Sequence, residues 1–234
     1  MRLVLIALSA LTVGGCTEPE YKYAGFRTYD YFPLDGTRTW KYKHAVHDYL
    51  LEVDMETEPE VEGATRIHTL RYKQDEPSRV LYAIKWSSDS TDGVQIHGYI
   101  VENEPAEVSE DGDDTGEPSG GDDTASTAVD TITDGWVDFD PPLQLTEYQM
   151  APGDVLKSSA GGDDYTSTFE QTESCPNDWR DDWECLRLVI ESSSSDPAPF
   201  VGTWHWATEY GTSLFEPVGE AAPWTLVEAT WFAS

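Results

Sequence analysis

Basic residues are scarce in this sequence of 234 residues. It has 14 Lys and Arg against 45 Asp and Glu, which gives a formal net charge of −31 at pH 7. The imbalance is uneven, because no Lys or Arg occurs between Lys85 and Lys157, whereas 18 Asp and Glu do. Such a field repels nucleic acid phosphates and anionic lipid headgroups. The composition therefore predicts no nucleic acid partner and favours a solvated acidic surface.

Signatures of catalysis are also missing. The sequence has no G-x-S-x-G elbow, no H-E-x-x-H pair and no glycine-rich phosphate loop. We therefore expect no enzymatic activity, name no catalytic residue and expect no cofactor. A hydrolase that uses two carboxylates stays a less favoured alternative, since 45 acidic residues make such a pair uninformative.

Long apolar runs are limited to the first residues. Arg2 precedes an apolar run of about eleven residues, which is shorter than the roughly 20 residues that span a bilayer. Residues 1–15 thus predict a secretory signal peptide. Val13-Gly14-Gly15-Cys16 resembles the lipobox of bacterial lipoproteins. The resemblance implies cleavage before Cys16, lipid on that cysteine as the contact with the membrane, and a tether over residues 16–25.

Two further observations bear on this anchor. Thr17, in place of Asp, resembles the pattern of lipoproteins sent on to the outer membrane. A plain secretory signal with an incidental cysteine is the alternative.

Cysteine is rare, with three in the chain, and lipid on Cys16 would leave Cys175 and Cys185 as one pair. Exported chains meet oxidising conditions, so we expect a disulfide. A metal site is the rival, but two thiolates without a nearby His leave it incomplete.

Alternation of apolar and polar residues dominates the rest of the chain and is typical of half-buried strands. Turn residues separate the alternating segments, and no segment has a convincing period of 3.6. We therefore predict an all-β protein with a single antiparallel domain over residues 26–234, built as a curled sheet, a β-sandwich or a half-barrel. The predicted strands are residues 37–43, 49–56, 64–72, 79–86, 94–101, 135–139, 143–148, 154–159, 164–173, 184–191, 203–210 and 225–232.

An acidic stretch at about 103–134 interrupts this pattern. It has almost no apolar residue and cannot bury enough surface to offset the entropy of ordering it. We predict a long disordered loop inside the single domain. Within it, Asp111, Asp113, Thr115 and Asp122 partly resemble a calcium-binding loop. Thr115 and the short Asp122 are poor ligands there, so we expect weak Ca²⁺ association at most.

Three short motifs resemble a group of β-rich bacterial lipoproteins of unknown role. Residues 31–42 match their opening F-P-L-x-x-G-x-x-W-x-Y. Residues 140–154 are similar to their central segment, and residues 204–211 to a late strand and turn, although Glu209 and Tyr210 depart from that pattern. The resemblance implies a curled antiparallel sheet or sandwich and assigns no functional residue.

Aromatic residues supply the first candidate site. Trp204 and Trp206 share a strand face, which favours core packing, but an exposed row of aromatics could stack on sugar rings. Trp179, Arg180 and Trp183 lie between the two paired cysteines, where aromatics and an Arg on a stapled loop would suit a binding surface.

Histidines supply the second candidate site. His44, His47 and Asp48 could hold zinc if His68 or His97 came close. Positions 44 and 47 point to opposite faces of an extended chain, so polar loop residues are the favoured interpretation unless a bend intervenes.

The sequence therefore predicts a non-enzymatic, lipid-anchored protein of the cell envelope with a structural, binding or assembly role. The alternative is a carbohydrate- or peptide-binding module that uses exposed aromatics. A glycan or an envelope protein is the candidate partner.

Overall fold

Antiparallel strands make up almost all of the regular structure. The computed structural model describes residues 26–34, 37–75, 78–102, 135–176 and 184–232, and the statements below concern these residues. Among them, no helix is long and apolar enough to cross a membrane. The elements are β1 (Phe26–Arg27), α1 (Thr28–Tyr31), β2 (Thr37–His44), β3 (Leu50–Met55), β4 (Glu60–Glu62), β5 (Thr65–Gln74), β6 (Arg79–Asp89), β7 (Gly93–Val101), β8 (Val137–Gln144), β9 (Gln149–Met150), β10 (Val155–Ala160), β11 (Asp163–Ser174), β12 (Glu184–Ser192), β13 (Gly202–Ala207), β14 (Gly211–Pro217) and β15 (Trp224–Phe232).

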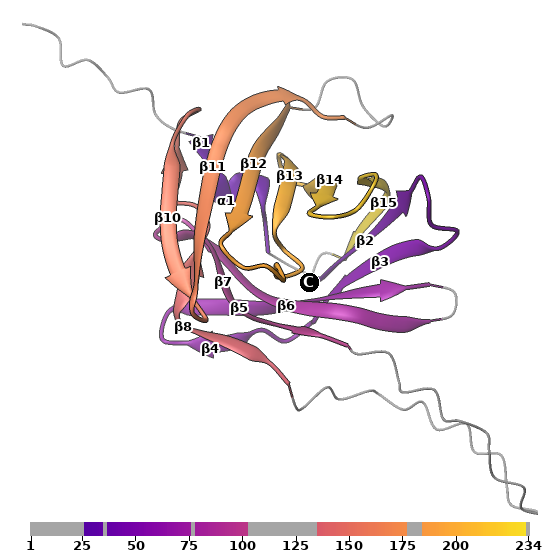
Figure 1. Cartoon of the computed structure of the whole chain (residues 1–234), viewed down its shortest axis with the longest axis horizontal. Coiled ribbons are helices and arrows are strands. Elements are labelled where there is room, and N and C mark those ends of the chain that lie inside the picture. The colour runs from indigo at the N-terminus through magenta and orange to yellow at the C-terminus, as the bar shows by residue number, and fades with distance from the viewer. Residues whose placement is uncertain (1–25, 35–36, 76–77, 103–134, 177–183, 233–234) are drawn as a thin grey trace, which may run out of the picture.

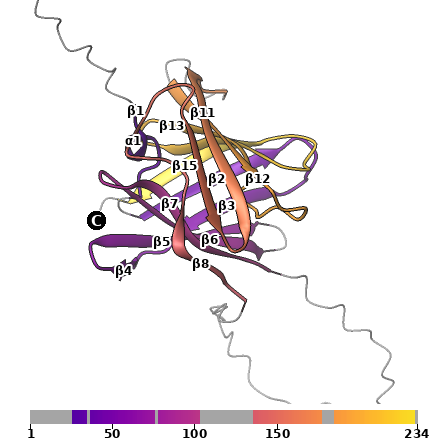
Figure 2. The ribbon, with the colours of Figure 1, turned by 60° about the vertical axis from the view of Figure 1, so that its left-hand side comes forward.

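The main sheet curls into a nearly closed barrel (Figures 1 and 2). Its strand order is β10-β11-β12-β13-β14-β15-β2-β3-β5-β6-β7-β8, and β4 pairs with β5 beside this path. The sheet therefore consists of two meanders, one from each end of the domain, which join where β15 pairs antiparallel with β2. The edge strands β8 and β10 meet on the opposite side, where Ser158 Oγ donates to the Gln144 carbonyl oxygen at 3.0 Å.

Alternation along strands such as β2 and β3 decides which of their side chains fill the barrel. In β3, Leu51, Val53 and Met55 are buried and their neighbours are only half-buried. In β2, the inward-facing Trp40 and Tyr42 are buried in the same way. Burial of one such side chain contributes about 1.5–3 kcal/mol, so a strand of this pattern has one favoured orientation.

The segment before β2 enters the barrel and fills its centre. Phe32 follows α1, is 4% exposed, and its ring centroid lies 4.8 Å from those of both Trp86 and Trp206. These two indoles belong to opposite walls, β6 and β13. Phe32 therefore connects the two meanders through the lumen as well as around the wall.

Polar groups close the end of the barrel where this segment enters. Thr28 Oγ1 donates to the Glu147 carbonyl oxygen at 2.7 Å, and Thr146 Oγ1 donates to Thr28 Oγ1 at 3.0 Å. The Val94 amide donates in turn to Thr146 Oγ1 at 3.0 Å. All three residues are buried, so this chain of bonds satisfies polar groups that would otherwise destabilise the core.

The Cys175–Cys185 disulfide is present and links the end of β11 to the start of β12. Cys185 is fully buried, and its Sγ lies 3.1 Å from the hydroxyl of Ser213. The bond closes a loop with a sequence separation of 10 residues. A loop of this length corresponds to roughly 2–3 kcal/mol of stabilisation in the chain-entropy account.

The predicted all-β antiparallel architecture is confirmed, with a curled, nearly closed main sheet among the predicted alternatives, and three details of the strand prediction are wrong. Residues 135–139 and 143–148 are not two strands, because β8 covers Val137–Gln144 as one element, although its pairing with β7 shifts register between Asp138 and Leu143. Residues 203–210 are not one strand, because β13 ends at Ala207 and β14 follows after a tight turn. The short elements β1, α1, β4 and β9 were not predicted. The signal peptide, Cys16, the tether and the acidic stretch 103–134 lie outside the described residues.

Candidate functional site

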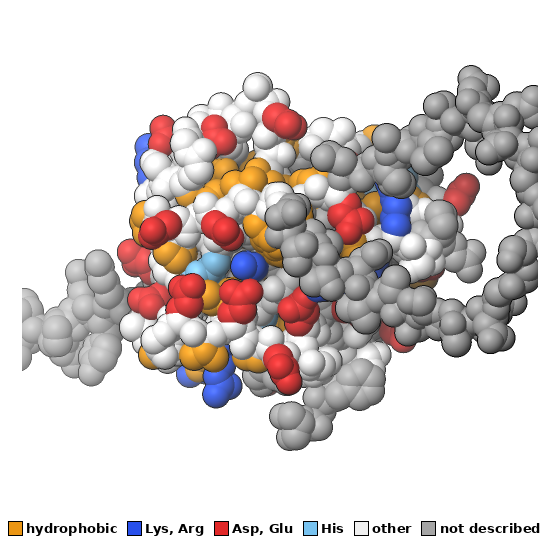
Figure 3. Space-filling model, turned by 90° about the horizontal axis from the view of Figure 1, so that it is seen from below, with side chains coloured by type: hydrophobic (Ala, Val, Ile, Leu, Met, Phe, Trp, Pro, Cys, Tyr) orange, Lys and Arg blue, Asp and Glu red, His pale blue; other side chains and the backbone are white. Residues whose placement is uncertain are grey.

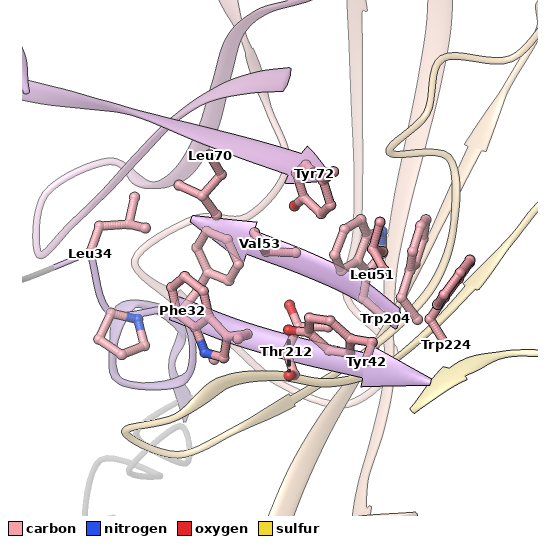
Figure 4. A pocket seen from close by; sticks show the side chains of 14 residues that line it. Phe32, Leu34, Tyr42, Leu51, Val53, Leu70, Tyr72, Trp204, Thr212 and Trp224 are labelled. Atoms are coloured by element: carbon pink, nitrogen blue, oxygen red, sulfur yellow. Dashed lines mark hydrogen bonds between the residues drawn. The ribbon is translucent and has the colours of Figure 1, made fainter. Parts of the chain in front are cut away.

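The lumen of the barrel is packed. An apolar cavity of about 20 Å³ lies inside it, lined by Phe32, Leu51, Tyr72, Trp204 and Trp224 together with their neighbours. Figure 4 shows these side chains converging from β2, β3, β5 and the opposite wall. Such a volume holds about one water molecule. This cavity is too small for a lipid or a sugar.

Hydrogen bonds across the lumen add to this packing. Three side chains of β2 donate to backbone oxygens near the β13–β14 turn: Arg38 to Glu209 at 2.8 Å, Trp40 to Tyr210 at 2.7 Å and Tyr42 to Thr212 at 3.0 Å. Burial raises the pKa of the Tyr42 hydroxyl well above its ordinary value, so this group stays a proton donor. These residues hold the fold together.

The candidate aromatic residues divide into two groups. Trp204 and Trp206 are 1% and 0% exposed, so the core interpretation is confirmed and neither ring can stack on a sugar from outside. Trp204 also donates through Nε1 to the Phe200 carbonyl oxygen at 2.9 Å. Trp179, Arg180 and Trp183 lie outside the described residues, as do the calcium candidates Asp111, Asp113, Thr115 and Asp122.

An outer polar face covers β5, β6 and β7. Figure 3 shows acidic side chains spread over this side of the molecule, with histidine and basic side chains among them. His97 Nε2 lies 2.9 Å from Ser87 Oγ, and burial lowers the pKa of His97. Lys85 pairs with Glu60 at 3.3 Å and lies over the Trp136 ring at 4.8 Å. These partners join β4, β6, β7 and the start of β8, so the face serves structure.

A shallow groove of about 440 Å³ lies outside β2, β3 and β5. Two ion pairs line it, Arg71 with Glu56 at 2.6 Å and Lys73 with Asp54 at 2.7 Å. Because both cations already have carboxylate partners, the groove offers an anionic ligand little net charge to bind.

A cluster of histidine and carboxylate side chains lies at the rim of the barrel. His44 ends β2 and is buried, and the chain bends after it at residues 45 and 46. The bend returns His47 to the same side, with the two imidazole centroids 4.5 Å apart. The bend that the sequence analysis named as the exception is therefore present, because the strand stops at His44 and the chain bends at once.

The third member comes from the other end of the sequence. Glu220 belongs to the turn between β14 and β15, and its Oε2 lies 3.2 Å from His44 Nε2. Trp224 Nε1 donates to the same oxygen at 3.0 Å. The metal-ligating atoms of His44, His47 and Glu220 all lie within 4.8 Å of one another. We name these three residues the rim cluster.

Aromatic stacking fixes the exposed histidine of the rim cluster. The His47 ring stacks on Trp224, with centroids 5.4 Å apart and 13° between planes, and on Tyr49, with centroids 5.0 Å apart. The partners suggested by the sequence, Asp48, His68 and His97, are not in this group. Glu220 was missed, because nothing in its local sequence indicates that it meets His44 across the sheet.

Comparison with models of known protein families, with curated proteins and with solved structures finds no match to this chain. The resemblance to β-rich lipoproteins therefore stays a prediction from the three short motifs.

Proposed function

We propose that this chain is a non-enzymatic lipoprotein of the cell envelope, anchored by lipid on Cys16 to a membrane, with the outer membrane as its expected address. The observation that carries the proposal is the pairing of the cysteines. Cys175 and Cys185 are bonded to each other, which leaves Cys16 as the one cysteine of the three without a disulfide partner in this chain. A stable disulfide suits an exported protein.

The packed lumen supports a structural, binding or assembly role on the outside of the barrel. A carrier of small apolar molecules needs a cavity of several hundred Å³, and the internal space here is about 20 Å³. A binding role would thus use the outer surface or the rim. For the glycan- or peptide-binding alternative, the burial of Trp204 and Trp206 leaves Trp179, Arg180 and Trp183, which the sequence places between the bonded cysteines.

The anchor is tested by expressing the full chain in a bacterium that processes lipoproteins and by measuring the mass of its N-terminal peptide. We expect a peptide that begins at Cys16 and carries diacylglycerol, and a protein that sediments with membranes. The Cys16→Ala variant should lose both properties while the Cys175–Cys185 bond stays oxidised. An unmodified Cys16 in the wild-type protein would exclude the anchor.

A further inference from the structure

The rim cluster has the composition and spacing of a metal site, and we propose that His44, His47 and Glu220 bind a divalent transition metal ion such as Zn²⁺. No other group of three or more His, Cys, Asp or Glu ligand atoms lies this close together in the part of the chain that the structure describes. The site is independent of the lipid anchor, because it uses only side chains of the barrel rim.

Distances between the ligand atoms fit a shared ion. Zinc binds nitrogen and oxygen ligands at about 2.0–2.2 Å, so two ligands of one tetrahedral ion lie roughly 3.3 Å apart. His44 Nε2 and Glu220 Oε2 already lie 3.2 Å apart. All three ligand atoms lie within 4.8 Å of one another, so one ion can bind all three once the His47 imidazole moves closer to the other two.

Neighbouring groups orient two of the three ligands. Trp224 Nε1 holds the Glu220 carboxylate at 3.0 Å, and the Trp224 ring stacks on His47. The Tyr49 ring also stacks on the His47 ring. Support of this kind around ligands commonly changes metal affinity by about 10- to 100-fold.

Binding has a definable cost at His44. The Val46 amide donates to His44 Nδ1 at 3.1 Å, so the neutral imidazole carries its proton on Nε2, which lies 2.7 Å from the Ala222 carbonyl oxygen. For Nε2 to bind a metal ion, the ring must release this proton to water and accept one at Nδ1. The hydrogen bond from the Val46 amide to Nδ1 is then lost, because both nitrogens carry a proton. We therefore expect weaker binding than at a closed structural site.

The ligand types select the class of ion. Two imidazoles and a carboxylate suit Zn²⁺, Ni²⁺ and Cu²⁺, whereas Ca²⁺ and Mg²⁺ prefer sets made only of oxygens. The net charge of −31 attracts every cation without selectivity. Selectivity for zinc over calcium is thus the property that separates the rim cluster from the acidic surface.

The test is calorimetric titration of the purified full chain, with its disulfide oxidised, with Zn²⁺ alone in a buffer that does not bind metals. The variants are His47→Ala and Glu220→Gln, each of which removes one ligand at an exposed position. Asp48→Asn and Glu216→Gln are matched controls, since each removes an exposed charge within four positions of a ligand in the sequence and removes no ligand. Thermal unfolding without metal verifies that every variant is folded.

We expect one saturable Zn²⁺ site per chain that millimolar Ca²⁺ does not compete away. Each ligand variant should weaken it at least about tenfold, and each control should change it less than twofold. The proposal is wrong if no saturable binding occurs, if Ca²⁺ competes equally well, or if the controls weaken binding as much as the ligand variants do.

Discussion

His205 illustrates what single residues on the barrel wall contribute. It lies on β13 and is 6% exposed, with Nδ1 2.7 Å from Glu173 Oε1. Burial lowers the pKa of His205, and Arg187 has a smaller effect in the same direction. The carboxylates of Glu173 and Glu216 raise this pKa, but burial outweighs them. The imidazole is therefore neutral in the folded protein at neutral pH.

This shift gives a pH dependence of stability with a definite sign. The unfolded chain takes up a proton near pH 6.5, and folded His205 does so only at lower pH. The contribution of neutral His205 to the stability of the folded protein is complete above about pH 6.5 and is lost as the pH falls below that value. Between pH 7.5 and 5.5, the free energy of unfolding should therefore fall less in the His205→Gln variant than in the wild-type protein. Denaturant titration at the two pH values measures this difference. Equal losses in the two proteins would contradict the prediction.

At the scale of elements, the segment after α1 packs inside the barrel between opposite walls. Phe32 contacts Trp86 and Trp206 on opposite walls, with both centroid distances at 4.8 Å. Its removal leaves a cavity that a sheet closed on nearly all sides cannot collapse to fill. Hydrogen bonds of Thr28 with residues 146–148, which are remote in the sequence, hold this segment in place at the barrel end.

Phe32→Ala should lower the free energy of unfolding by about 3–5 kcal/mol, which is typical of a buried aromatic side chain. Urea titration followed by circular dichroism measures the loss. Val61→Ala on β4 is the control, because Val61 is 66% exposed and its truncation should cost less than about 0.5 kcal/mol. A similar, small effect of both substitutions would show that the ring does not pack in the lumen.

Individual strands also show where sequence patterns succeed and fail. Residues 37–43 and 49–56 predicted β2 and β3 to within a residue, because alternation reports burial of one face. The β13–β14 turn was missed because Glu209 adopts a positive φ of 69°, which its residue type does not signal. Prolines 141 and 142 suggested a break, yet β8 is an edge strand, where missing amide donors are tolerated.

At the scale of the whole molecule, charge is the dominant feature. With 45 acidic and 14 basic residues, repulsion between like charges exceeds attraction between opposite charges. Ion pairs such as Lys41 with Glu52 and Arg187 with Glu170 offset part of this repulsion. This repulsion destabilises the compact state and is screened by salt. The screening length falls from about 30 Å at 0.01 M to about 8 Å at 0.15 M.

NaCl added from 0.01 to 0.15 M should therefore raise the Tm of the protein by a few degrees, on the order of 1 kcal/mol in stability. Scanning calorimetry in the presence of a chelator measures the change without any contribution from bound metal. A fall in Tm would mean that the surface ion pairs outweigh the repulsion.

The sequence by itself determined the all-β class, the inward face of strands such as β2 and β3, and the pairing of Cys175 with Cys185. These follow from local alternation and from the small number of cysteines. Only the tertiary structure decided that the sheet closes through β15 and β2 and that His44 and His47 meet Glu220. The reason is distance along the chain. His44 bonds to Ala222, 178 positions away, and no local pattern specifies which remote turn a strand end will meet once the sheet has curled.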